Sequence, residues 1–258
     1  FQVRQESTLL GAWAVVRKNG KSSKSKDTRQ EIEVFESRLN TNLRRISSQL
    51  RKGRYRFPEA LGIPKRRKGN APRPLVVTPI EGRVVQRAIL DILQKLPAIS
   101  QVLDTPTSFG AIPGKNVRKA VEAAYAAMKR GFNYYIASDI HSFFSNIRKS
   151  EVVAAVRRMV NDEQFLELFE KAIAVELANM SELRNYADLF PLHEVGVAQG
   201  CCLSPLIGNI VLQDFDQQLN GRNIICLRYI DDFLILGRTR SSVLKAYKSA
   251  LKLLHAHG

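Results

Sequence analysis

Two adjacent aspartates interrupt an apolar stretch near the end of the sequence. Residues 226–230 precede Asp231 and Asp232, and the apolar residues 233–236 follow them. Two apolar runs separated by a two-residue polar break predict a β-hairpin. Like charges about 4 Å apart repel by about 4 kcal/mol at an effective dielectric constant near 20, so a cation must compensate them. A pair of Mg²⁺ ions would do so, because hard divalent ions prefer carboxylate oxygens.

A third aspartate, Asp139, follows a short apolar run at residues 134–137. The length of this run predicts a buried strand. A two-metal site usually takes a further carboxylate from a separate element, so we predict that Asp139 joins Asp231 and Asp232. Two ions about 3.5–4 Å apart can activate an attacking 3′-hydroxyl and stabilise a leaving pyrophosphate. Considered alone, the acidic pair is more simply interpreted as a solvated turn.

The rest of the chain alternates helical patterns with short strands. Apolar residues at three- and four-residue steps, together with start and stop signals, predict helices over residues 32–50, 84–96, 117–130, 165–173 and 205–219. A basic turn before a β-branched run predicts a hairpin with a charged tip at residues 63–78. Ser150 is a candidate N-cap. Residues 17–29 are polar, basic and Ser-rich, which predicts a mobile loop or linker.

The charge of the chain indicates its class of partner. Forty Lys and Arg against 24 Asp and Glu give a formal net charge of +16. Such an excess attracts polyanions and makes their binding sensitive to salt, which favours nucleic acid. The alternatives are a solvated basic surface or a protein that binds a membrane surface. No stretch approaches the roughly 20 apolar residues of a membrane-spanning helix, so we expect no membrane partner and a cytoplasmic protein.

Three motifs, taken together and in order, resemble those of a known family. Residues 229–232 (YIDD) resemble the Y-x-D-D box of reverse transcriptases, residues 138–144 resemble their first catalytic motif, and residues 199–205 resemble their Q-G-x-x-L-S-P motif. The likeness covers nearly the whole chain and is greatest for the bacterial group II intron and retron-like branch, which includes defence-associated members. The sequence departs from that branch at Gly82, His141 and Ser142, where Asp, Lys and Gly are usual.

The resemblance implies an α+β polymerase right-hand fold. Residues 1–130 would form the fingers with an N-terminal extension, and residues 131–258 the palm, whose antiparallel sheet is backed by helices. A helical thumb follows the palm in this family, and we expect it to lie outside these 258 residues.

The resemblance also implies roles for the acidic residues and their neighbours. Asp139 and Asp231 would bridge two Mg²⁺ ions, with Mn²⁺ as a substitute. Ile140 would offer its backbone carbonyl, and Asp232 would support the cluster. Phe144 matches the bulky gate that excludes a ribose 2′-hydroxyl, although it could instead pack in the core beside Phe143.

Further residues resemble those that contact nucleotide, template and primer. Lys65 and Arg73 would grip the incoming triphosphate, for which Lys supplies a point charge and Arg a bidentate fork. The remaining candidates are Gln199 and Gly200 at the nucleotide, Arg66 and Arg67 at the template backbone or simply in solvent, and Tyr229 near the primer terminus or in the core.

The function implied is RNA-directed DNA polymerase. Its partners would be dNTPs, an RNA template, a DNA or RNA primer and, in some settings, a dedicated non-coding RNA. Untemplated or protein-primed DNA synthesis in antiphage defence is one alternative, and a catalytically silent nucleic-acid-binding scaffold is another. Intron mobility, retron synthesis and defence all use such a core, so the biological setting stays open.

Overall fold

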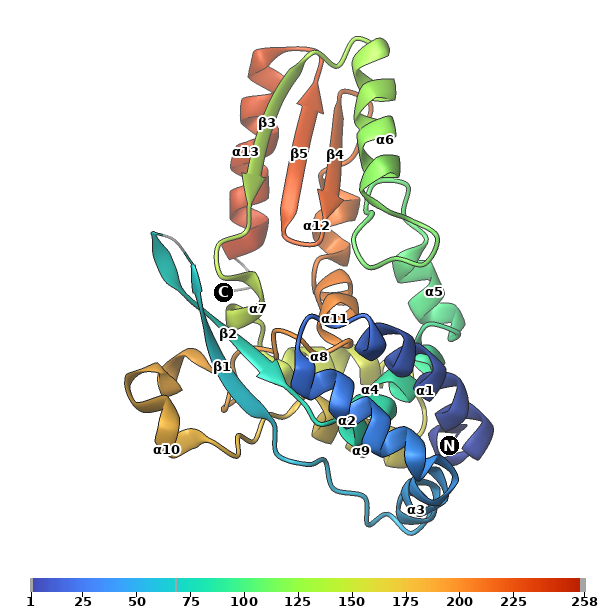
Figure 1. Cartoon of the computed structure of the whole chain (residues 1–258). Coiled ribbons are helices and arrows are strands. Elements are labelled where there is room, and N and C mark those ends of the chain that lie inside the picture. Colours follow the sequence, from blue (N-terminus) through green and yellow to red (C-terminus); the bar gives the residue numbers. More distant parts are fainter. Residues whose placement is uncertain (1, 68, 256–258) are drawn as a thin grey trace. The chain divides into compact units, whose positions relative to one another are not determined.

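The chain is divided into two compact units, each built from two separate segments. The computed structural model describes residues 2–67 and 69–255 (Figure 1). Unit 1 comprises Phe1–Leu96 and Arg148–Ser204, and unit 2 comprises Pro97–Ile147 and Pro205–Gly258. The predicted division of the chain into fingers (residues 1–130) and palm (residues 131–258) remains a prediction.

Unit 1 consists of helices and one β-hairpin. Its helices are α1 (Glu6–Lys21), α2 (Lys26–Ser37), α3 (Leu39–Arg51), α4 (Ile80–Leu93), α8 (Lys149–Arg157), α9 (Glu163–Ile173) and α10 (Met180–Leu183), with 3₁₀ turns at Gln2–Arg4 and Arg184–Leu189. Helix α4 contacts both α1 and α9. It supplies much of the unit's core, because Val84, Val85 and Ile89 are fully buried.

The loop predicted over residues 17–29 is wrong, since only residues 22–25 separate α1 from α2. Gly20, within the predicted loop, lies inside α1, where an added Cβ would come 2.5 Å from Ile32 Cγ1. Glycine thus lets the two helices approach closely. Ser25 caps α2, because its hydroxyl oxygen accepts a hydrogen bond from Thr28 N at 3.2 Å.

Two other helix predictions in unit 1 need correction. The single helix predicted over residues 32–50 is broken at Arg38, whose φ of −124° and ψ of 30° lie outside the helical range. Ser150 is not an N-cap, because α8 already begins at Lys149 with Arg148 at the cap position. The helices predicted over residues 84–96 and 165–173 are confirmed as α4 and α9.

The hairpin predicted at residues 63–78 is confirmed. Strand β1 (Leu61–Arg67) pairs antiparallel with β2 (Asn70–Val77), and Lys65 lies opposite Arg73. The C-terminal end of β2 is hydrogen-bonded to a loop that is distant in the sequence, because Val76 N donates to Gln199 O at 2.8 Å.

Unit 2 contains a three-stranded antiparallel sheet in the order β3-β5-β4. Its elements are α5 (Pro97–Leu103), α6 (Val117–Lys129), β3 (Tyr134–Asp139), α7 (Phe143–Asn146), α11 (Ser204–Val211), α12 (Gln213–Gln218), β4 (Ile224–Tyr229), β5 (Asp232–Gly237) and α13 (Arg240–His255). The helix predicted over residues 117–130 is confirmed as α6, whereas the one predicted over 205–219 is divided at Leu212.

Helices cover both faces of this sheet (Figure 1). Leu236 of β5 packs with Ala127 of α6 in a buried cluster. Phe233 points to the opposite face, since strand side chains alternate, and its ring centroid lies 5.4 Å from that of Phe215 on α12. Helix α13 contacts β3 and β5. The predicted α+β class with an antiparallel sheet backed by helices is confirmed.

Two predictions about the strands are wrong in detail. The run at residues 134–137 is not buried, because β3 is an edge strand and Tyr134 and Tyr135 are 50% and 63% exposed. The hairpin predicted at residues 226–236 is confirmed, but its turn residues are Ile230 and Asp231, and Asp232 opens β5. None of the helices in the described residues is long and apolar enough to cross a membrane.

Candidate active site

The turn between β4 and β5 carries the two adjacent aspartates. Tyr229 and Asp232 are paired across the ladder, so Ile230 and Asp231 form a two-residue loop. Ile230 has a φ of +61°, and Asp231 has no positive φ. This is the pattern of a type II′ turn, whose first central residue is ordinarily Gly. A β-branched residue in this conformation costs on the order of 1–3 kcal/mol, so the surrounding structure must hold it.

The third aspartate lies directly beside this turn. Asp139, the last residue of β3, is the register partner of Asp232. The next residue continues the link, because Ile140 N donates to Asp231 O at 2.9 Å. Asp139, Asp231 and Asp232, from two separate segments, therefore lie near one another at one end of the sheet, and their role as a joint metal site remains a prediction.

The electrostatics of Asp232 reflect this proximity. Its carboxyl pKa is raised above the usual value, first by desolvation and then by the charges of Asp231 and Asp139. A raised pKa means that the ionised carboxylate is less favourable here than in water. The site therefore favours any ligand that brings positive charge.

The donor chemistry of the three residues fits a hard divalent cation, since all are carboxylates. Within residues 2–67 and 69–255, however, no three His, Cys, Asp or Glu side chains converge as a ready-made set of metal ligands. Because like charges repel, three carboxylates would approach one point closely only with a cation between them. Asp139 and Asp232 are nevertheless partners in the strand register, and the charges of Asp231 and Asp139 both raise the pKa of the Asp232 carboxyl.

Phe143 and Phe144 follow Asp139 on the short helix α7. Phe143 is buried and lies against Gly208, where an added Cβ would come 2.8 Å from its ring. Phe144 is half-buried, and the two ring centroids are 5.2 Å apart. One ring thus belongs to the core while the other remains partly accessible.

Tyr229 is half-buried and packs against the buried cluster of unit 2. Part of this ring therefore packs in the core, which is the alternative role stated for Tyr229 in the sequence analysis. Its place near a primer terminus remains a prediction.

Three of the predicted nucleotide-binding residues lie together in unit 1. Arg73 Nε donates to Gln199 Oε1 across 126 positions of the sequence. Gly200 has a φ of +116°, and an added Cβ would come 2.8 Å from the Val76 carbonyl oxygen. The missing side chain thus allows the loop to lie against β2.

The basic residues of the β1–β2 hairpin are only partly described. Lys65 and Arg66 are exposed. The side chain of Arg67 and the whole of Lys68 lie outside the described residues. Lys65 and Arg66 are therefore free to meet a ligand in solvent, and the roles of all these residues remain predictions.

Sequence reasoning missed the residue that supports the acidic turn. Arg228 lies in β4 and is only 1% exposed, and its guanidinium forms an ion pair with Asp216. The sequence does contain a signal for this role, since Arg228 is a charged residue inside an otherwise apolar run. A charged side chain that is buried needs a specific partner.

Comparison with known proteins identifies relatives of this chain. The family model described as "Reverse transcriptase (RNA-dependent DNA polymerase)" matches residues 63–258. Protein YkfC of Escherichia coli K12 is 28% identical over 194 residues, which cover 73% of this chain and 48% of YkfC. An uncharacterised 91 kDa protein in the cob intron of Schizosaccharomyces pombe is 25% identical over 173 residues, covering 67% of this chain and 20% of that protein. The chain thus spans half or less of the length of these relatives.

Solved structures share the fold. A chain of a partial Cas6-RT-Cas1–Cas2 complex superposes with a TM-score of 0.54 at 20% identity, covering 99% of this chain and 42% of its own length. Telomerase from Candida albicans gives a TM-score of 0.53 at 15% identity, covering 87% of this chain and 44% of its own length. These likenesses confirm the predicted polymerase right-hand fold.

Proposed function

The chain belongs to the reverse transcriptase (RNA-dependent DNA polymerase) family, and from this we propose that it adds dNTPs to a primer along an RNA template, using Asp139, Asp231 and Asp232. The observation that carries the proposal is the pairing of Asp139 with Asp232 beside the Asp231 turn. Three carboxylates at one sheet end suit the binding of two Mg²⁺ ions, with Mn²⁺ as a substitute. Such ions, when bound, activate the attacking 3′-hydroxyl and stabilise the leaving pyrophosphate.

The residues of the chain then orient the reactants. Asp139 and Asp231 would hold the metal ions from two segments, and Ile140 would add its backbone carbonyl. Asp232, which is exposed and starts β5, would balance charge beside them.

A second group would select and bind the nucleotide. Arg73, oriented by Gln199, and the exposed Lys65 would contact the triphosphate, since both offer charged donors to phosphate oxygens. Gly200 would allow the backbone to approach the base pair. Phe144 would exclude the ribose 2′-hydroxyl.

Binding of template and primer would rest largely on charge. The net charge of +16 favours binding to the phosphate backbone. Arg66 and Arg67 are candidates for contacts with the template, and Tyr229 for contact with the primer terminus. One relative is encoded in an intron, which supports placing this chain near the group II intron and retron-like branch.

The test is primer extension on an RNA template with dNTPs and Mg²⁺. We expect template-directed extension by the parent protein and a loss of about 100-fold or more in Asp231→Asn, because charge stabilisation at the reacting phosphate is removed. Asp214→Asn is the matched control, since it removes the charge of an exposed aspartate elsewhere in unit 2. Extension that ignores the template sequence would favour untemplated synthesis. No extension by any form would favour a silent scaffold.

A further inference from the structure

The turn that presents Asp231 holds a conformation that its own residues do not favour. Ile230 occupies a position at which Gly is usual, with a φ of +61°. A strained, β-branched residue beside a functional group persists only where neighbouring contacts determine its conformation. The groups that hold Ile230 lie in its immediate surroundings.

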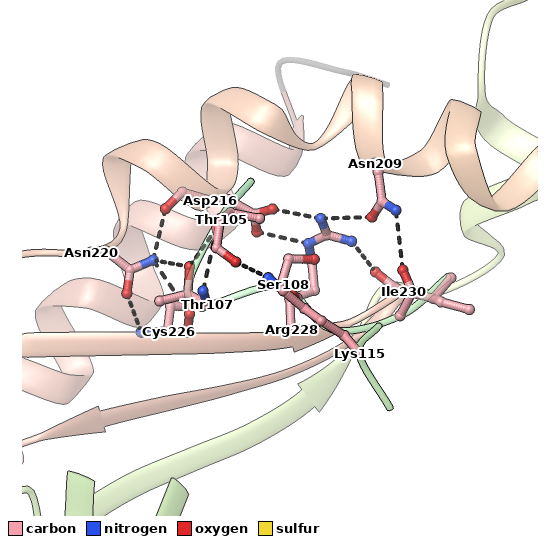
Figure 2. Close-up of polar contacts among 11 residues, drawn as sticks. Thr105, Thr107, Ser108, Lys115, Asn209, Asp216, Asn220, Cys226, Arg228 and Ile230 are labelled. Atoms are coloured by element: carbon pink, nitrogen blue, oxygen red, sulfur yellow. Dashed lines mark hydrogen bonds and ion pairs between the residues drawn. The ribbon is translucent and has the colours of Figure 1, made fainter. Parts of the chain in front are cut away.

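One buried side chain reaches the Ile230 carbonyl. Figure 2 shows the guanidinium of Arg228 between Asp216 and Asn209, with one nitrogen directed to Ile230. Nη1 of Arg228 donates to Ile230 O at 2.8 Å. Because Arg228 lies in β4 two residues before Ile230, this bond links the end of the strand to the turn that follows it.

The orientation of this guanidinium is fixed by helix α12. Nε and Nη2 of Arg228 donate to the two carboxylate oxygens of Asp216 at 2.7 and 2.5 Å. Nη2 also donates to Asn209 Oδ1 at 3.1 Å. A guanidinium is a rigid planar fork, so two bonds to one carboxylate determine the direction of the third nitrogen. Asp216 is 7% exposed, which places the pair away from water and from screening by salt.

A second support approaches the turn from the segment before α6. An added Cβ on Gly110 would lie 2.5 Å from Ile230 N, so the backbone of this glycine packs directly on the turn. Its carbonyl oxygen accepts a hydrogen bond from Asn209 Nδ2 at 3.1 Å. Asn209 thus links the Gly110 backbone to the guanidinium of Arg228.

These contacts act on Asp231 through the backbone. The Ile230 carbonyl and the Asp231 N–H belong to one planar peptide group. A hydrogen bond to that oxygen therefore fixes the orientation of the peptide group that precedes the Asp231 Cα. On the other side of the residue, Asp231 O accepts the hydrogen bond from Ile140 N, at the end of β3. Both peptide groups that flank Asp231 are therefore anchored.

We propose that Arg228, oriented by Asp216 and Asn209, is a positioning residue that holds the Ile230 turn so that the Asp231 carboxylate faces the Asp139 side of the site. This inference rests on the proposed polymerase function, because it assigns Asp231 to the reacting centre. The ion pair is not required merely to neutralise the strand, since an apolar residue of similar volume would cost less desolvation.

Arg228→Lys tests the proposal, because lysine keeps the charge but lacks the fork that reaches Asp216 and Ile230 together. We expect kcat to fall by about 10- to 100-fold and Mn²⁺ to bind about tenfold more weakly, as is common when groups that orient metal ligands are lost. The KM for dTTP should change less than kcat, because the nucleotide-binding residues in unit 1 are untouched. Mn²⁺ affinity is measured on the protein alone by electron paramagnetic resonance, and unfolding temperature is measured alongside.

Asn220→Ala is the matched control. Asn220 also makes buried contacts in unit 2, where its Nδ2 donates to Asp216 O at 2.7 Å and its Oδ1 accepts from Cys226 N at 2.8 Å. Its contact with Asp216 is to the backbone oxygen, so the variant leaves the pairing of the Asp216 carboxylate with Arg228 in place. We expect Asn220→Ala to lower the unfolding temperature while Mn²⁺ affinity and kcat of the folded protein stay within about twofold of the parent.

Asn209→Ala provides a second route if Arg228→Lys does not fold. It removes the link between Gly110 and the guanidinium while leaving the ion pair in place. We therefore expect kcat and Mn²⁺ affinity to fall, but by less than in Arg228→Lys. The proposal is overturned if both Arg228→Lys and Asn209→Ala bind Mn²⁺ as the parent does, or if their losses only follow the loss of stability seen with Asn220→Ala. A parent protein that binds Mn²⁺ in an Arg228-dependent way but extends no primer would refute the polymerase function and leave the positioning role intact.

Discussion

Asp139 on β3 and Asp232 on β5 face each other as register partners in an antiparallel ladder. Directly opposed residues in such a ladder have Cβ atoms about 4.5–5.5 Å apart, and like charges at this position destabilise the sheet. The pairing therefore lowers the stability of the fold, whereas it favours the binding of a ligand of opposite charge.

Asp232→Asn should stabilise the metal-free protein. Desolvation, then Asp231 and Asp139, raise the pKa of the Asp232 carboxyl. The ionised group therefore opposes folding at neutral pH. As pH falls through the raised folded-state pKa toward the unfolded value near 4, the folded protein takes up the proton first and the penalty disappears.

We expect the unfolding temperature of Asp232→Asn to exceed that of the parent by about 1–3 °C at pH 7, a small gain because the group is largely solvated. The difference should shrink as pH approaches 4. Thermal unfolding in EDTA measures it, with Asp214→Asn as the control for charge removal alone. A parent that is more stable than Asp232→Asn in EDTA at pH 7 would contradict the electrostatic interpretation.

Phe144→Ala should admit ribonucleotides. In the gate role proposed for Phe144, removal of its half-buried ring would open space beside the sugar. We therefore expect the preference for dNTPs over rNTPs to fall by about 10- to 100-fold, the range typical of a changed pocket contact. Single-nucleotide incorporation with matched dNTP and rNTP measures this preference. Phe143→Ala is the control, because it removes a buried ring at a cost of about 3–5 kcal/mol in stability and should leave the preference unchanged. Equal preference in Phe144→Ala and the parent would exclude the gate.

The acidic hairpin could be predicted from the sequence because its signals are local. Two apolar runs and an acidic break lie within eleven residues, and the structure contains the hairpin. The turn was misplaced by one residue because Ile230 is held in its conformation by groups elsewhere in the chain. Gly110 lies 120 positions before it, and no local pattern reveals that its backbone packs on the turn.

Residues 17–29 show the opposite error, in which local signals were misleading. Gly20 and Ser25 resemble loop residues in isolation, but one is a point of close helix packing and the other is an N-cap. The contact of Arg73 with Gln199 was also beyond local patterns, since only the family resemblance linked two residues so far apart.

Gly200→Ala should destabilise unit 1. The φ of +116° is unfavourable for alanine, and the new Cβ would meet the Val76 carbonyl at 2.8 Å. We expect a loss of about 1–3 kcal/mol in the free energy of unfolding, measured by urea denaturation. Gly11→Ala is the matched control in the same unit, because an added Cβ there meets nothing within 4 Å. Alanine inside helix α1 should stabilise by up to about 1 kcal/mol. A neutral Gly200→Ala would show that the loop is not held against β2.

Binding of a primer–template should depend steeply on salt. If about four Lys or Arg residues contact phosphates, affinity should fall about 100-fold between 50 and 200 mM salt. Arg66→Ala should reduce the slope of log affinity against log salt by about 1 if this exposed residue contacts the template. Fluorescence anisotropy with a labelled duplex measures both quantities. Arg118→Ala is a control from the exposed face of α6, where Arg118 Nε donates to Glu122 Oε1 at 2.8 Å. An unchanged slope in Arg66→Ala would place this residue in solvent.

Gly110→Ala should disturb the acidic turn without touching any aspartate. The added Cβ would come 2.5 Å from Ile230 N and would also overlap the Ile230 side chain, so the turn must move. A displacement of about 1 Å at a reacting group can reduce activity about 100-fold, and we expect a loss of this order in primer extension. Gly114→Ala is the control, because its φ of +75° makes alanine unfavourable while an added Cβ meets nothing within 4 Å. Gly114→Ala should therefore lose stability and keep its rate per folded molecule, whereas Gly110→Ala loses both. Equal rates in the two variants, each corrected for the folded fraction, would mean that the position of the turn does not govern the reaction.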